Sequence, residues 1–177
     1  MSPASSNRGM RPVFSFTVCE ADIQNHPFLS RGEGRMNCKF LKWSDQLCIG
    51  VAPLDEGHKE LVDLYNRIAW ACENDPDKNT VCERLLSFVI YAKHHFKEEE
   101  AYMLSIHYND YVQHKSEHDR VLQDAEDFID NLSGSMAMLD GQAIVKYFKY
   151  WLLRHILTRD ADLRRFADQS VAEGQEG

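Results

Sequence analysis

The segment from Tyr91 to Met103 constrains the fold of this chain more than any other, because it combines helical periodicity with ionisable residues on its apolar side. Apolar residues recur in and just before it at steps of three and four: Leu85, Phe88, Val89, Ala92, Phe96 and Met103. In a helix these positions share one face, and His95 and Glu99 fall on that same face. A buried imidazole and carboxylate are costly without partners, so the pattern indicates a metal ion between them.

Three further segments carry the same helical periodicity, so the sequence predicts four helices. We expect them at about residues 54–73, 80–103, 110–132 and from Asp140 onward, with Thr80-Val-Cys-Glu83 as a capping box. Asn74-Asp-Pro-Asp77 ends the first helix, and no strand-like alternation competes with this interpretation. The predicted fold is all-α: an up-down-up-down antiparallel four-helix bundle with a metal site in its core.

The two ends of the chain differ from the helical part. Residues 1–35 are rich in Ser, Pro, Gly, Asn and Arg and lack periodicity, which predicts a disordered N-terminal extension. An alternative hypothesis is that translation begins at Met36. The helical domain is expected at residues 36–170, followed by a polar tail at 171–177.

Charge and cysteine content exclude several classes of function. The formal net charge is -8 and no Lys/Arg cluster is present, which argues against a nucleic-acid partner. No apolar run approaches the roughly 18 residues of a membrane span. The five cysteines are scattered without a Cys-x-x-Cys pair, which indicates free thiols in a reducing compartment. The sequence therefore predicts a cytoplasmic protein.

Every predicted helix places at least one histidine on its apolar face. The inward-facing ionisable residues are His58, His95, Glu99, His114, His118, His155 and Asp160. One buried histidine would more often be a hydrogen-bonded core residue, but five of them beside two acids favour a shared site. The remaining histidines lie elsewhere: His26 in the extension, His94 on the outward face and His107 in a loop.

The number and type of these residues indicate two metal ions. Imidazole and carboxylate suit iron, zinc or copper, and seven ligands exceed the four of a tetrahedral zinc. Two octahedral ions need roughly twelve coordination positions. If both carboxylates bridge and one oxygen also bridges, all positions but one are filled. The last position would take one small exogenous ligand.

These residues resemble the hemerythrin family, and in particular the bacteriohemerythrins, over about residues 40–166. The motifs that carry the resemblance are Trp43…Ile49-Gly50, Asp55-Glu-Gly-His-Lys59, His95-Phe-Lys-Glu-Glu-Glu-Ala-Tyr-Met103, His114-x-x-x-His118 and Trp151-Leu-Leu-Arg-His-Ile-Leu-Thr-Arg-Asp160. All seven ligand positions of the family carry the expected residue type in the expected order. One departure is Gly57, where relatives usually carry a longer polar residue; it is expected to loosen the first helical turn.

The resemblance implies a non-haem centre of two iron ions, cycling between Fe2+ and Fe3+ and joined by an oxo or hydroxo bridge. His58 and His95 would bind one iron, while His114, His118 and His155 would bind the other. Glu99 and Asp160 would bridge them, and dioxygen would bind at the iron with two histidines. Residues matching the walls of the oxygen pocket, which are also core residues, are Leu61, Phe96, Trp151, Leu152 and Ile156.

The expected function is reversible dioxygen binding for storage, transport or delivery to oxygen-consuming enzymes, rather than catalysis. Five neutral imidazoles and two carboxylates disfavour high-valent iron, and the chain lacks the Glu-x-x-His pairs of ferritin-like oxidising centres. Alternatives are a di-iron oxidase, peroxidase or nitric-oxide enzyme, and a sensor of oxygen, redox state or iron. His114-Lys-Ser-Glu-His118 also fits a zinc-protease signature, which leaves the other five residues unexplained.

Overall fold

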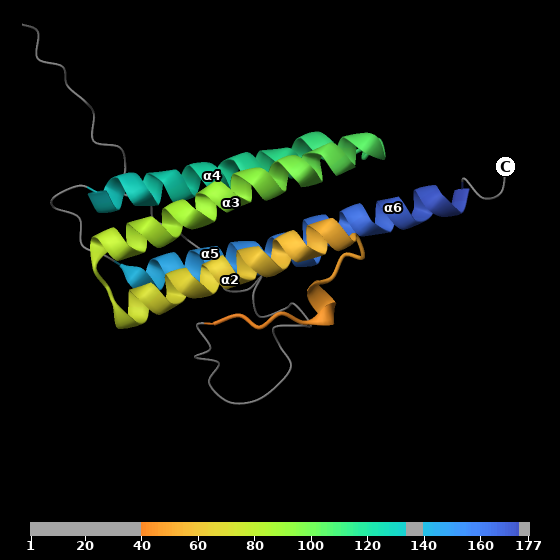
Figure 1. Ribbon diagram of the computed structural model, residues 1–177. Helices are drawn as coiled ribbons and strands as arrows, with labels where there is room; N and C mark the ends of the chain where they lie inside the picture. The colour runs from red at the N-terminus through yellow and green to blue at the C-terminus, as the bar shows by residue number, and fades with distance from the viewer. Residues whose placement is uncertain (1–39, 134–139, 174–177) are drawn as a thin grey trace, which may run out of the picture. The chain divides into compact units, whose positions relative to one another are not determined.

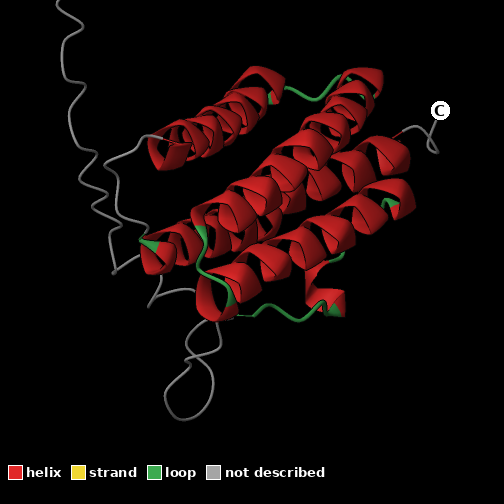
Figure 2. Cartoon of the chain, turned by 60° about the vertical axis from the view of Figure 1, so that its left-hand side comes forward, coloured by secondary structure: helices red, strands yellow, loops and turns green. Residues whose placement is uncertain are grey.

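Four long helical segments follow one another along the chain in the computed structural model, which describes residues 40–133 and 140–173, with side chains through residue 169. The elements are η1 (Asp45–Leu47), α2 (Ala52–Asn74), α3 (Lys78–Ser105), α4 (Tyr111–Ser133), α5 (Gly141–His155), η2 (Ile156–Asp160) and α6 (Ala161–Glu173). Successive long helices run in opposite directions (Figure 1), and the described residues contain no strand (Figure 2). The predicted all-α, up-down-up-down bundle is confirmed.

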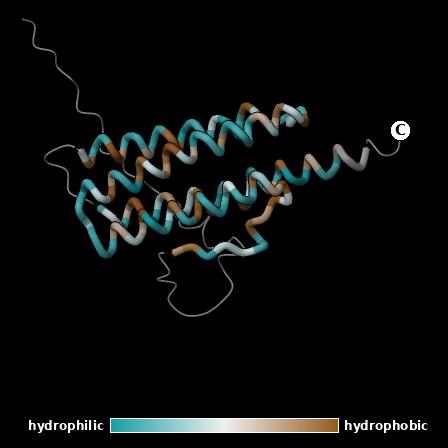
Figure 3. The backbone as a smooth tube through the Cα atoms, in the orientation of Figure 1, coloured by the Kyte–Doolittle hydropathy of each residue, from teal (hydrophilic) through white to brown (hydrophobic). Residues whose placement is uncertain are grey.

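Each helix buries an apolar face and leaves a polar one outside. Apolar and polar residues alternate along the helices at helical spacing (Figure 3). Tyr65 and Ile68 of α2 are fully buried, and Phe88 of α3 meets Phe148 of α5 edge to face with ring centroids 5.3 Å apart. Aromatic pairs of this kind fix neighbouring helices beyond the effect of burial alone. None of the described helices is both long and apolar enough to cross a membrane.

The predicted helix starts are close to those observed, with one correction. The capping box predicted at Thr80 is wrong: α3 begins at Lys78, and its N-cap is Asp77, whose carboxylate accepts from the Thr80 N–H at 3.1 Å. The Asp77 side chain gives a hydrogen-bond partner to an N–H of the first turn that would otherwise lack one. The helix can therefore begin before Thr80. Asp140 caps α5 in the same way, accepting from the Ala143 N–H at 3.0 Å.

A π-helical turn, η2, joins α5 to α6 within the segment that the sequence predicted as one helix from Asp140 onward. The Ala161 N–H donates to the carbonyl of Ile156, five residues earlier. In a regular α-helix, residues five apart point about 140° away from each other. The wider π turn instead lets His155 and Asp160 both face the core, where they are 3% and 0% exposed.

The segment before α2 is tied to that helix by its backbone. Asn66 of α2 accepts from the Leu41 N–H at 2.7 Å and donates to the Leu41 carbonyl at 2.9 Å. The buried carboxylate of Asp55 accepts from the N–H groups of Ile49 and Gly50 at 2.7 and 3.1 Å. The loop thereby fixes the first turns of α2. The predicted extension (1–35), its alternative start at Met36 and residues 174–177 of the tail lie outside the described residues.

Replacing Asp55 with alanine should lower the free energy of unfolding by about 1–3 kcal/mol, because two backbone N–H groups lose a charged acceptor. Urea denaturation of the metal-free protein, followed by circular dichroism, measures this. The control is Asp63→Ala, which removes only an exposed ion pair to Arg67 on the same helix and should change stability by about 0.5 kcal/mol or less. Equal losses in the two variants would contradict the role of Asp55.

Candidate metal centre

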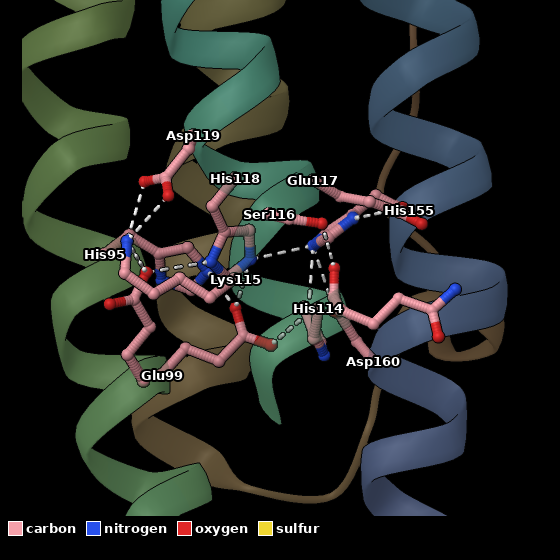
Figure 4. A network of polar contacts seen from close by, with 12 residues as sticks. His95, Glu99, His114, Lys115, Ser116, Glu117, His118, Asp119, His155 and Asp160 are labelled. Carbon is pink, nitrogen blue, oxygen red and sulfur yellow. Dashed lines mark hydrogen bonds and ion pairs between the residues drawn. The ribbon is translucent and has the colours of Figure 1, made fainter. Parts of the chain in front are cut away.

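The structure brings all seven predicted site residues together inside the bundle. They come from every long segment: His58 from α2, His95 and Glu99 from α3, His114 and His118 from α4, His155 from α5 and Asp160 from η2. All seven are between 0% and 3% exposed. Figure 4 shows six of them, from α3, α4, α5 and η2, pointing toward one another. Two groups among them could each hold a metal ion, and Glu99 belongs to both.

The first group is the three-histidine half, formed by His114, His118 and His155. The Nε2 atom of His155 lies 3.2 Å from Nε2 of His114 and 3.0 Å from Nε2 of His118. Ligands at right angles around one ion, each about 2.1 Å from it, lie about 3 Å apart. These nitrogens therefore lie as neighbouring corners of an octahedron would.

The second group is the two-histidine half, formed by His58 and His95. Their rings meet edge to face with centroids 4.7 Å apart. His58 Nε2 lies 3.0 Å from Oδ2 of Asp160, and His95 Nε2 lies 3.7 Å from Oε2 of Glu99. This half therefore has one imidazole fewer than the other, and an acid reaches each of its rings.

Both carboxylates contact both halves. Glu99 places Oε1 3.3 Å from Nε2 of His114, while its Oε2 lies 3.6 Å from Nε2 of His118 as well as near His95. Asp160 directs Oδ2 to His58, and its Oδ1 lies 3.2 and 3.3 Å from Nε2 of His114 and His155. The coordination count required two acids that each reach both halves. The structure contains this arrangement.

Many polar atoms of this cluster lack hydrogen bonds within the described part of the chain. They include both ring nitrogens of His58 and His95 and both oxygens of Glu99 and Asp160. Buried polar atoms without partners are strongly unfavourable, so a cluster of this size needs a further species among them. Nitrogen lone pairs and carboxylate oxygens that face one another are satisfied by cations. The donor set fits two first-row transition metals.

The electrostatics of the site also favour cations. Burial lowers the pKa of His95 to about 3 and that of His118 still further, so these imidazoles are neutral and can donate lone pairs. Burial and the nearby Asp160 raise the pKa of Glu99 well above its usual value. Burial also opposes ionisation of Asp160, but His155 and His58 outweigh it and hold that pKa well below the usual range. A bound cation would allow Glu99 to ionise as well.

Gly57 has a steric role that the sequence interpretation missed. It lies inside α2 and is buried beneath the His95 ring. A Cβ on Gly57 would overlap Nδ1 of His95 and lie 2.6 Å from Cε1. A glycine inside a helix costs about 1 kcal/mol relative to alanine, and that penalty next to His58 was the available signal of a packing requirement.

Four of the five predicted pocket residues are buried and Trp151 is half-buried; ring contacts place Phe96 and Trp151 at the site. Phe96 stacks on His118 with centroids 3.9 Å apart, and Trp151 stacks on His155 at 4.9 Å. Leu61, Leu152 and Ile156 are also buried. Phe96 and Trp151 therefore pack against the three-histidine half. The role of all five residues as an oxygen pocket stays a prediction.

The histidines predicted to lie outside the metal site were expected on the outer surface, in a loop or in the N-terminal extension. His94 is 71% exposed and lies 3.5 Å from Glu98 on the outer face of α3. His107 is in the loop between α3 and α4 and has a positive φ of 55°. Both predictions are confirmed, whereas His26 lies outside the described residues.

A four-helix bundle with buried histidines and acids in its core defines a class of metal-binding helical proteins. The family described as "Hemerythrin HHE cation binding domain" matches residues 49–167, and the chain belongs to this hemerythrin family. A hemerythrin-like protein of Naegleria gruberi is 31% identical over 118 residues, which cover 67% of this chain and 86% of the relative.

Other relatives extend the comparison. A bacteriohemerythrin of Clostridium acetobutylicum is 29% identical over 125 residues, covering 68% of this chain and 95% of the relative. Myohemerythrin-1 of Phascolopsis gouldii is 31% identical over 119 residues, covering 67% and 87%. The crystal structure of a wild-type hemerythrin superposes with a TM-score of 0.61 at 25% identity, over 68% of this chain and 92% of that one.

Replacing Gly57 with alanine should displace the His95 ring and weaken the two-histidine half. After anaerobic loading with ferrous iron, we expect the variant to retain about one metal ion per chain fewer than the parent protein. Elemental analysis measures this. The control is Glu56→Ala, the adjacent exposed position on α2, which should retain the parent content. Full metal content in the Gly57 variant would contradict the steric role.

Proposed function

We propose that this protein binds dioxygen reversibly at a non-haem di-iron centre held by His58, His95, Glu99, His114, His118, His155 and Asp160. The observation that carries the proposal is the pair of buried, unequal halves that share both carboxylates. Such a protein would store or transport oxygen, or deliver it to oxygen-requiring enzymes.

The inequality of the two halves supports a single binding position for a small molecule. The three-histidine half has three imidazoles and shares two acids, while the two-histidine half has two imidazoles and the same acids. The vacancy therefore falls in the half formed by His58 and His95. Two ferrous ions held by the seven residues would supply the two electrons that dioxygen takes up.

The protein's own residues favour release of oxygen over its consumption. Five imidazoles are neutral ligands, so they compensate less of the metal charge than a carboxylate-rich set would, and higher oxidation states are less favoured. The buried side chains of Leu61, Leu152 and Ile156 keep the surroundings apolar. Exclusion of water removes a source of protons for side reactions.

The zinc-protease alternative requires Glu117 as its general base, and the surroundings of Glu117 do not suit that role. Contact with His155 and Arg159 lowers the pKa of Glu117 to about 2, and Arg159 Nε donates to it at 2.7 Å. A general base works best with a pKa near the operating pH. An oxidase, a peroxidase, a nitric-oxide enzyme or a sensor would use the same seven residues, so those alternatives are distinguished by activity.

The decisive measurement is the visible spectrum of iron-loaded protein through repeated cycles of oxygen addition and removal. We expect an oxygen-dependent absorption that disappears on deoxygenation and returns on re-exposure, with about two irons per chain. Steady consumption of oxygen in the presence of a reductant would instead assign the protein to the di-iron enzymes. One metal per chain, or no change in colour in air, would overturn the proposal.

Adjacent histidines on α3 provide a matched pair of variants. His95→Ala should abolish the oxygen-dependent absorption and remove about one iron per chain, since it takes a ligand from the half with the vacancy. His94→Ala changes the same residue type at an exposed neighbouring position and should leave both properties unchanged. If the two variants had the same spectrum and iron content, His95 would not be a ligand.

A further inference from the structure

Two acids outside the set of seven lie behind histidines of the three-histidine half. Oε1 of Glu100 is 3.3 Å from Nδ1 of His118, within hydrogen-bond distance. Oε2 of Glu117 is 3.7 Å from Nδ1 of His155, and Figure 4 shows the two side chains facing each other. Each acid therefore meets the ring nitrogen that points away from the centre of the site.

Each of these outer acids is itself oriented by a cation. Arg159, the residue before Asp160 in the π turn, contacts Oε1 of Glu117 through both Nε at 2.7 Å and Nη2 at 2.5 Å. Lys115 lies 3.8 Å from Oε1 of Glu100 and pairs more closely with Asp119 at 2.7 Å. The acids thus have defined positions rather than freely rotating in solvent.

An acceptor at Nδ1 decides which nitrogen of a neutral imidazole carries the proton. A carboxylate there favours the Nδ1–H form, which leaves the lone pair of Nε2 free. Nε2 of His118, whose Nδ1 meets the Glu100 carboxylate, lies 3.0 Å from Nε2 of His155, whose Nδ1 faces Glu117 at 3.7 Å. Two lone pairs at this distance repel each other unless a cation lies between them, so the outer acids prepare this half for a metal.

The two-histidine half has no corresponding support. Among the described residues, Nδ1 of His58 and Nδ1 of His95 lack hydrogen-bond partners, and the ring of His95 rests on Gly57. Nδ1 of His114 and Nδ1 of His155 also lack hydrogen bonds to described residues. Glu100 thus supports His118 by a hydrogen bond, Glu117 faces His155 at the longer distance of 3.7 Å, and both contacts lie in the same half. The difference between the halves therefore extends beyond the ligands themselves.

We propose that Glu100 and Glu117 are positioning residues that make the three-histidine half the tighter of the two metal sites. This half takes up the first metal ion and keeps it when a chelator removes the second. The inference rests on the proposed two-metal centre, but it concerns the order and strength of loading rather than oxygen binding.

The test is titration of the metal-free full-length protein with Co2+, whose visible absorption reports each binding step. In the parent protein we expect two steps of different affinity. Glu100→Gln and Glu117→Gln should each weaken the tighter step by about 10–100-fold, the range typical for loss of an outer partner of a metal-binding histidine. The weaker step should be unchanged, so the two affinities converge.

The matched control is Glu126→Gln, which removes a carboxylate that pairs with Lys93 across α3 and α4 at 2.6 Å, with both side chains exposed. It should leave both steps unchanged. Thermal unfolding of the metal-free variants separates positioning from general destabilisation. If Glu100→Gln and Glu117→Gln weaken both steps equally, or match Glu126→Gln, the inference is overturned while the two-metal centre stands. A parent protein that binds fewer than two ions would instead overturn the proposed function itself.

Discussion

The structure depends on one electrostatic constraint: seven ionisable side chains share a buried space in which they cannot satisfy one another. Burial lowers the pKa values of His95 and His118 and raises that of Glu99, so the cluster presents lone pairs and oxygens to a common centre. Hydrophobic packing of the surrounding helices holds this arrangement together. Phe88 packs on Phe148 in the core, and Phe96 stacks on His118, so the packed aromatic rings reach the site itself. Any cation bound among these side chains would therefore stabilise the bundle as well.

Helical periodicity was sufficient to predict the bundle and the inward position of six of the seven site residues, whereas Asp160 faces the core beside His155 because of the π turn. The reason is physical: at 3.6 residues per turn, an inward-facing histidine is visible as a polar residue within an apolar stripe, as with His95 beside Phe88 and Phe96. Helix ends were less predictable. Thr80 and Asp77 are both good capping residues in the same short loop, and only the backbone geometry decides between them.

Other features were beyond the reach of periodicity. The π turn breaks the helical repeat, so the spacing of His155 and Asp160 did not indicate it. The contact of Gly57 with the His95 ring joins two helices and has no local pattern. Helical periodicity assigned Glu100 and Glu117 no supporting role toward the site, because that role comes from reaching behind histidines on other helices. Sequence patterns identify residues that face inward, whereas contacts between helices determine how those residues are supported.

The π turn has a consequence for how this chain can vary. Its wider turn absorbs one extra residue, and the helix continues beyond it to Leu163 and Phe166, which pack with Tyr108. Deleting one residue between His155 and Asp160 would restore a regular helix in which the two side chains, then four residues apart, would still point within about 40° of each other. A five-residue spacing in a π turn and a four-residue spacing in an α-helix are thus two ways of directing the same pair of side chains into one core.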